Sequence, residues 1–165
     1  MLVNMHIKNN LTGFFKGFGY AVQGIIYCVK TQRNMRFHIG VAGIVFMLSL
    51  IRGLSSGELL VLLLTVGGVT SLECVNTAIE NAVDLASKGK ISLYAKAAKD
   101  CGAGAVLVFS VFALFVGIKI FGNRKTFALL YDFVIAKPWF AVIFLVYIAL
   151  WILWILKTDN NKDKD

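Results

Sequence analysis

The chain has 165 residues, of which 58 % are hydrophobic and only one is proline, and its mean hydropathy is +0.76. A soluble domain has roughly 45–50 % apolar residues, so the composition excludes an ordinary water-soluble fold and favours a protein in a lipid bilayer. The formal net charge of +8 does not indicate nucleic-acid binding, because the basic residues flank apolar segments without an aromatic recognition motif. The expected partners are anionic lipid headgroups and phosphates.

Four apolar segments predict transmembrane helices. They cover residues 37–51, 59–78, 102–118 and 139–156. About 17–25 residues are needed to cross a hydrocarbon core of about 30 Å, and the first segment reaches this length only with its flanks. The sequence therefore predicts an all-α integral membrane protein. Residues 52–58 predict a tight turn between the first two spans, and residues 122–125 begin the link from the third span to the fourth.

Two further segments predict helix or turn outside the bilayer core. Residues 11–30 mix aromatic and aliphatic side chains with lysine, glutamine and interspersed glycines, a pattern typical of an amphipathic helix that lies in the membrane interface. Residues 85–100 are more polar and are broken near Gly89, which predicts a cytoplasmic turn that leads into the third span. We expect residues 1–10 to form an N-terminal tail and the charged residues 158–165 to be disordered.

The distribution of basic residues predicts the orientation of the spans, because Lys and Arg are enriched in cytoplasmic loops. On the side of the N-terminus lie Lys8, Lys16, Lys30, Arg33, Arg36, Lys88, Lys90, Lys96, Lys99, Lys157, Lys162 and Lys164. On the other side lie Arg52, Lys119, Arg124, Lys125 and Lys137. This asymmetry predicts that both termini are cytoplasmic.

Polar side chains share one face at the end of the second predicted span. At about 100° per residue, Glu73, Asn76, Glu80 and Asp84 fall within about 80° of one another on a helical wheel. If the span starts at residue 59, Glu73 lies roughly 21 Å along it, and Glu80 about 10 Å further on, at the membrane edge. An ionisable side chain at that depth is costly and is expected to face the protein interior. The pattern alone leaves open a structural hydrogen-bond network, a proton or ion pathway, or catalysis.

This face lies at the boundary between lipid and water. That position suits the transfer of a chemical group between a molecule in water and a molecule in the membrane. Glu73 could accept the proton of a lipid hydroxyl held at headgroup level. Glu80 and Asn76, nearer water, could hold the Mg²⁺ of a nucleotide, because Mg²⁺ takes hard oxygen ligands from one or two carboxylates and from phosphates. The phosphate-binding glycine motifs of soluble kinases are absent from the sequence.

Two stretches resemble a known family. Residues 73–84, ECVNTAIENAVD, and residues 98–107, AKDCGAGAVL, resemble the two-part signature of the prokaryotic diacylglycerol kinase family, whose Gram-positive members act mainly as undecaprenol kinases. The resemblance covers roughly residues 11–121, and residues 31–38, TQRNMRFH, are similar to the undecaprenol kinase branch. It implies an ATP- and Mg²⁺-dependent lipid kinase of the bacterial inner membrane. It also implies a homotrimer of three-span subunits, each with an N-terminal surface helix, and active sites shared between neighbouring subunits.

The resemblance also implies roles for individual residues. Glu73 matches the proposed general base, and Glu80 matches a glutamate that binds the metal together with the nucleotide. The matches to nucleotide-binding residues are Tyr20, Asn76, Lys99 and Asp100.

This sequence departs from the family pattern at a metal ligand. Gln32 stands where members carry the second metal-binding glutamate, and Gln23 where lysine is common. Glutamine keeps an oxygen donor but loses the charge, so we expect weaker Mg²⁺ binding unless Asp84 or a water molecule substitutes.

The fourth span, within residues 122–157, is an addition to the three-span kinase core. Some relatives carry a fused phosphatase, but that chemistry needs a Lys, Arg and His cluster, and the only histidines here are His6 and His38. Trp139, Trp151 and Trp154 fall near the ends of the span, as anchors at the membrane interface do.

Three functions therefore remain for comparison. The leading prediction is phosphorylation of undecaprenol to undecaprenyl phosphate. The same enzyme acting on diacylglycerol to make phosphatidic acid is the second, and a non-catalytic membrane protein of the same fold, suggested by Gln32, is the third.

Overall fold

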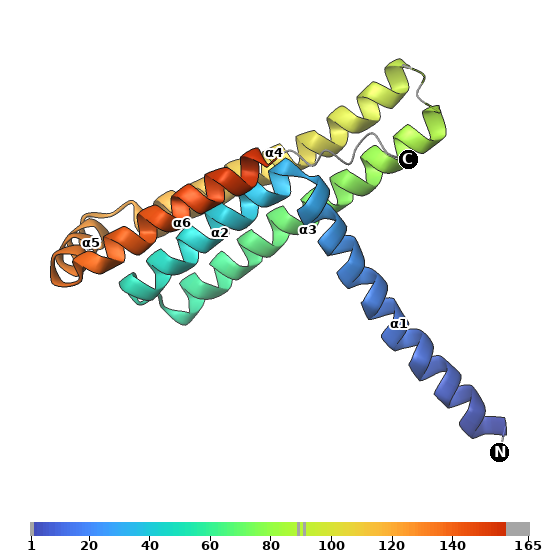
Figure 1. Ribbon diagram of the computed structural model, residues 1–165, viewed down its shortest axis with the longest axis horizontal. Coiled ribbons are helices and arrows are strands. Elements are labelled where there is room, and N and C mark those ends of the chain that lie inside the picture. Colours follow the sequence, from blue (N-terminus) through green and yellow to red (C-terminus); the bar gives the residue numbers. More distant parts are fainter. Residues whose placement is uncertain (1, 89, 91, 158–165) are drawn as a thin grey trace.

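The computed structural model describes residues 2–88, 90 and 92–157, with side chains from residue 14 onward. Within these residues the chain is all-helical and contains no strand (Figure 1). The helices are α1 (Leu2–Thr31), α2 (Arg33–Arg52), α3 (Ser56–Ser87), α4 (Leu93–Phe121), α5 (Arg124–Ala136) and α6 (Pro138–Leu156).

Four of these helices, α2, α3, α4 and α6, are long and apolar enough to cross a membrane. The predicted all-α fold with four membrane helices is thus confirmed, and the chain is a multi-pass membrane protein. α3 and α4 run well past their apolar segments, so most of the turn predicted over residues 85–100 is helix. Ser92 caps the start of α4, since its hydroxyl accepts a hydrogen bond from Ala95 N at 3.0 Å. The break predicted at Gly89 lies outside the described residues.

The first helix is longer than predicted and extends away from the bundle. α1 begins at Leu2 rather than at residue 11, so the N-terminal tail expected over residues 1–10 is helical from that point. Figure 1 shows α1 leaving the other helices at a steep angle. Phe14, Phe18 and Ile25 expose more than half of their surface, as suits a helix that lies in an interface. The expected disorder of residues 158–165 concerns residues outside the described part.

The predicted turn after the first span joins α2 to α3. Gly53 ends α2 with a φ of 64°, a left-handed conformation that favours glycine. Ser55 and Glu58 form a reciprocal capping box at the start of α3. Arg52 connects this turn to the start of α5. Its guanidinium binds Glu58 Oε1 at 2.7 Å, and its Nε donates to Thr126 Oγ1 at 3.0 Å.

The link between the third and fourth spans contains a helix that the sequence analysis did not predict. Asn123 caps α5, with its side-chain oxygen accepting from Thr126 N at 3.0 Å, and Pro138 starts α6 in its first turn. The chain therefore turns back at α5 and returns as α6 along α2 (Figure 1).

The helices pack as an antiparallel α3–α4 pair with α2 against α3 and α6 against α2. α3 and α4 extend beyond α2 and α6 at the end where they are connected (Figure 1). Close approach in the pair uses Gly68, where a Cβ atom would collide with the ring of Phe109. The polar face of α3 therefore begins inside the bundle and ends on the projecting hairpin.

Candidate active site

The four polar residues on α3 become more exposed toward the α3–α4 connection. Glu73 exposes 1 % of its surface and Asn76 5 %, whereas Glu80 is half-buried and Asp84 is exposed. Asn76 Nδ2 donates to Glu80 Oε1 at 3.2 Å, so these side chains share one face, as the spacing predicted. The face thus runs from a dry interior to the polar end of the bundle.

Glu73 is held by two neighbours, one from its own helix and one from α2. Thr77 Oγ1 donates to the backbone oxygen of Glu73 at 2.8 Å. The side-chain amide of Asn34, in the first turn of α2, lies beside the Glu73 carboxylate and interacts with it electrostatically. The second carboxylate oxygen, Oε2, is buried and has no hydrogen-bond partner among the described residues. A buried acceptor without a partner is uncommon, and it leaves this oxygen available to a further group.

The start of α4 covers the middle of this face. Gly102 is buried, and a Cβ atom there would lie 2.5 Å from Asn76 Oδ1, so only glycine allows α4 to come this close. Asn76 Oδ1 is a second buried oxygen that lacks a hydrogen-bond partner within the described part of the chain. Nearer the connection, Lys99 Nζ binds Asp84 Oδ1 at 2.5 Å and ties α4 to α3.

The oxygen atoms of this face suit Mg²⁺ better than a softer metal. Among the described residues, no three His, Cys, Asp or Glu side chains gather closely enough to hold a metal ion by themselves. Mg²⁺ bound with a nucleotide does not need such a cage, because it keeps waters and phosphate oxygens and takes only one or two carboxylates. The unpartnered Asn76 Oδ1 and the half-buried Glu80 are donors of this hard type.

The remaining predicted site residues lie at different distances from this face. Gln32 is the residue before α2, two positions from Asn34, and its side chain makes no capping hydrogen bond. Asp100 is exposed near the start of α4. Tyr20 lies on the projecting part of α1 with 69 % of its surface exposed, two turns before Tyr27, whose hydroxyl accepts from Asn81 Nδ2 at 3.4 Å. One chain therefore brings Glu73, Asn76 and Glu80 together but not Tyr20.

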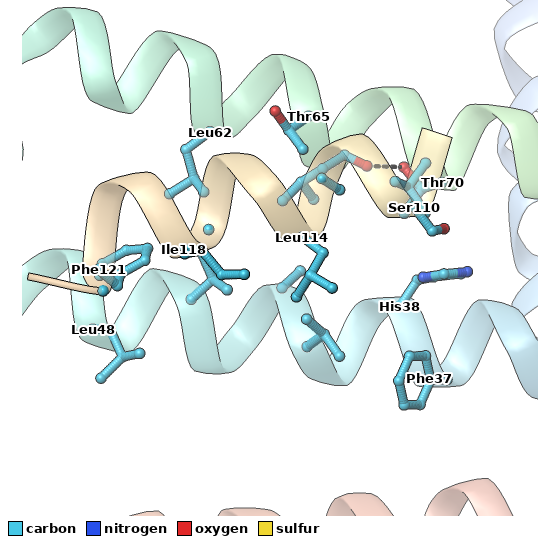
Figure 2. Close-up of a pocket in the computed structure, with 18 of the residues that line it drawn as sticks. Phe37, His38, Leu48, Leu62, Thr65, Thr70, Ser110, Leu114, Ile118 and Phe121 are labelled. Carbon is cyan, nitrogen blue, oxygen red and sulfur yellow. Dashed lines mark hydrogen bonds between the residues drawn. The ribbon is translucent and has the colours of Figure 1, made fainter. Parts of the chain in front are cut away.

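A long apolar cavity opens between α2, α3 and α4 and was not foreseen from the sequence. Its volume is about 610 Å³, and its lining is almost entirely aliphatic and aromatic. Figure 2 shows Leu48 and Phe121 at one end, and the polar side chains of His38, Thr70 and Ser110 toward the other. The hydroxyl of Ser110 is buried without a hydrogen-bond partner in the described structure.

The polar end of this cavity lies about one helical turn before Glu73 on α3. Thr70 precedes Glu73 by three residues on α3, a rise of about 4.5 Å. On α2, His38 follows Asn34 by four residues, about one turn, and Asn34 is the residue that contacts Glu73. The polar end of the cavity and Glu73 are thus about one turn apart on α3, although Glu73 is not among the residues that line the cavity. Sequence reasoning missed Asn34, although it lies within the segment of residues 31–38 that it singled out.

Most of the chain is similar in sequence to a family of known proteins. The sequence model of the family described as prokaryotic diacylglycerol kinase matches residues 19–121, from the second half of α1 to the end of α4. Undecaprenol kinase of Bacillus subtilis (strain 168) is 44 % identical over 114 residues, which cover 69 % of this chain and 92 % of that protein. Diacylglycerol kinase of Synechocystis sp. is 41 % identical over 100 residues, which cover 61 % of this chain and 57 % of that protein. No solved structure matches.

Proposed function

Because the chain belongs to the prokaryotic diacylglycerol kinase family and is a membrane lipid kinase, we propose that it phosphorylates undecaprenol to undecaprenyl phosphate with ATP and Mg²⁺. The relative named undecaprenol kinase supports this lipid, since the match covers 92 % of its length. The observation that carries the proposal is Glu73, a buried carboxylate whose Oε2 has no partner among the described residues and which lies one helical turn from an apolar cavity.

In the proposed reaction Glu73 is the general base. Its Oε2 takes the proton of the lipid hydroxyl, the hydroxyl oxygen forms a bond to the γ-phosphorus of ATP, and the bond from that phosphorus to the bridging oxygen breaks to release ADP. Asn34, whose amide lies beside the carboxylate, keeps it turned toward the hydroxyl. Because little covalent chemistry is required of the protein, positioning supplies much of the catalysis.

The polar end of the face binds the nucleotide in this proposal. Glu80 and the oxygen of Gln32 would hold Mg²⁺, which when bound neutralises charge on the phosphates. Asn76, Lys99, Asp100 and Tyr20 complete the nucleotide site, with Asp84 supporting Lys99 through their ion pair. Because Tyr20 stands apart from the others in one chain, we propose that its contact is made in a homotrimer whose subunits share active sites.

The cavity holds part of the lipid chain in this proposal. Its apolar lining suits a hydrocarbon, and its length is set by about ten residues of α2, from His38 to Leu48, which rise about 15 Å. That length accommodates only the first isoprene units of a long polyprenol, and the rest of the chain extends into the bilayer. The same cavity also accepts an acyl chain, and the Synechocystis relative named diacylglycerol kinase supports diacylglycerol as the alternative substrate.

We also propose the bacterial inner membrane as the location, with both termini in the cytoplasm. The basic residues are concentrated on that side, and ATP is available there for the Glu80 end of the face. The charged hairpin formed by the ends of α3 and α4 then projects into the cytoplasm.

The test is transfer of radiolabelled phosphate from ATP to undecaprenol and to diacylglycerol in mixed micelles containing Mg²⁺, with the unchanged protein and Glu73→Gln compared. We expect transfer to undecaprenol that disappears in Glu73→Gln, while binding of a fluorescent ATP analogue persists. Preference for diacylglycerol would replace the first substrate by the second. Transfer that survives in Glu73→Gln, or equal loss of transfer and nucleotide binding, would contradict the role of Glu73 as base.

A further inference from the structure

Helix α6 is seated on two glycines of α2. A Cβ atom at Gly40 would overlap the indole of Trp151, and one at Gly43 would overlap the hydroxyl of Tyr147. Any larger residue at either position would displace the ring that occupies it. The two aromatic side chains therefore rest directly on the backbone of α2, as small residues in membrane helices allow.

Two hydrogen bonds fix the register of this contact. Tyr147 Oη donates to the backbone oxygen of Gly40 at 2.9 Å, and Trp151 Nε1 donates to the backbone oxygen of Arg36 at 3.1 Å. The two donors are one turn apart on α6, and the two acceptors are one turn apart on α2. The Trp151 ring also packs on Phe37, with 5.6 Å between ring centroids. A sliding or rotation of α6 would break both bonds, and in a bilayer no water replaces them.

The turn of α2 that Trp151 contacts is the turn that carries the active-site side chains. The side chain of Asn34, two residues before Arg36, lies beside the Glu73 carboxylate and interacts with it electrostatically. Arg36 Nη1 donates to the backbone oxygen of Lys30 at 2.9 Å and so joins this turn to the end of α1. Gln32 lies immediately before it. α1, α3 and α6 therefore all contact residues 34–36 in the first turn of α2.

We infer that Tyr147 and Trp151 are positioning residues for phosphoryl transfer, because they hold the first two turns of α2 so that Asn34 keeps Glu73 oriented. This inference rests on the proposed role of Glu73. It gives α6 a function that lies outside the region matched by the family, which ends at residue 121. The effect passes from Trp151 through the backbone of α2 to Asn34, and neither aromatic residue touches the substrate.

The first test measures how readily the Glu73 carboxylate is chemically modified, and it needs no kinase activity. The probe is dicyclohexylcarbodiimide, an apolar reagent that modifies buried carboxyl groups, and the rate of Glu73 labelling in the full-length protein is followed by peptide mass spectrometry. Tyr147→Phe combined with Trp151→Phe removes both donors but keeps aromatic rings in place. We expect this double variant to label Glu73 several-fold faster, because Asn34 no longer covers one side of the carboxylate. Trp139→Phe, at the exposed far end of α6, is the control and should label at the unchanged rate.

The same labelling rates, measured in an Asn34→Ala background, distinguish a positioning role of α6 from a general loosening of the fold. If α6 acts through Asn34, then Asn34→Ala should itself speed up labelling, and adding the double change should have no further effect. If the double change accelerates Glu73 labelling equally with Asn34 present and in the Asn34→Ala background, α6 only stabilises the bundle. If it accelerates labelling in neither background, the inference is overturned. Gly40→Ala should reproduce the double variant, since its Cβ atom displaces the Trp151 ring.

Activity then tests the same inference at the reaction itself. We expect the double variant to lower kcat for lipid phosphorylation about tenfold, because small misplacements of reacting groups are costly, with the KM for ATP nearly unchanged. An unchanged protein without transfer to either lipid would contradict the proposed function, whereas an active protein whose kcat is unaffected by the double variant would contradict only the role of α6.

Discussion

Helix α3 carries a glutamate toward each end of the membrane bundle, and the two carboxylates differ in their hydrogen bonding. At one end, Glu58 accepts from Arg52 through Oε1 and from both the backbone and the side chain of Ser55 through Oε2. At the other, Glu73 is more deeply buried, yet its Oε2 is left without a partner in the described residues. Polar groups with complete hydrogen bonds hold a fold together, whereas an unsatisfied buried oxygen indicates a functional site.

The largest expected effect comes from removing the charge at each end in turn. Glu73→Gln should lower kcat by about 10³-fold, because a general base contributes roughly 10²–10⁴-fold to a reaction, while the melting temperature stays nearly constant. Glu58→Gln should leave kcat nearly unchanged but lower the melting temperature, because it weakens the capping box and the link to Arg52. The measurements are phosphate transfer in mixed micelles and thermal unfolding of both proteins. A reversed pattern would refute the distinction between the two ends.

The second effect concerns the apolar cavity, whose polar end lies one helical turn from Glu73. A Cβ atom at Gly117 meets nothing within 4 Å, so Gly117→Phe should place its ring in the cavity without disturbing the backbone. Displacing about two methylene groups of substrate should raise the KM for the lipid about tenfold, with the KM for ATP unchanged. Val111→Phe adds the same ring on an exposed part of α4 and serves as control. If both variants gave the same KM for the lipid, the cavity would not bind the substrate.

The third effect concerns Gln32, which we propose as a ligand of the metal. Gln32→Glu should lower the Mg²⁺ concentration for half-maximal activity about fivefold, because a charged acceptor binds about 1 kcal/mol more strongly than a neutral one. Gln23→Glu adds the same charge on α1, where no metal ligand is proposed, and should not change the metal dependence. An unchanged Mg²⁺ titration in Gln32→Glu would show that residue 32 does not hold the metal.

Parts of this molecule that depend on local pattern could be predicted from the sequence. The four spans follow from runs of apolar residues, and the shared face of Glu73 follows from helical periodicity. α5 was not predicted, although Asn123 and Pro138 mark its limits, because a short segment between two spans carries no apolar run long enough to indicate a further helix. The cavity and the fit of Trp151 on Gly40 could not be predicted, since both depend on how helices far apart in sequence pack together, in the second case more than 100 residues apart.

The smallest expected effect sharpens the comparison at the outer edge of the site. Lys99 and Asp84 form an ion pair whose side chains expose 36 % and 63 % of their surface, so Asp84→Asn should change the melting temperature little, as exposed pairs contribute about 0.2–1 kcal/mol. We nevertheless expect the KM for ATP to rise about twofold, because a freed Lys99 loses orientation toward the phosphates at a similar energetic cost. Asp132→Asn, an exposed acid on α5, should leave this KM unchanged. A KM shift in Asp84→Asn that vanishes in a Lys99→Met background would identify Lys99 as the phosphate contact. A shift that persists there would mean that Asp84 acts on the nucleotide by itself.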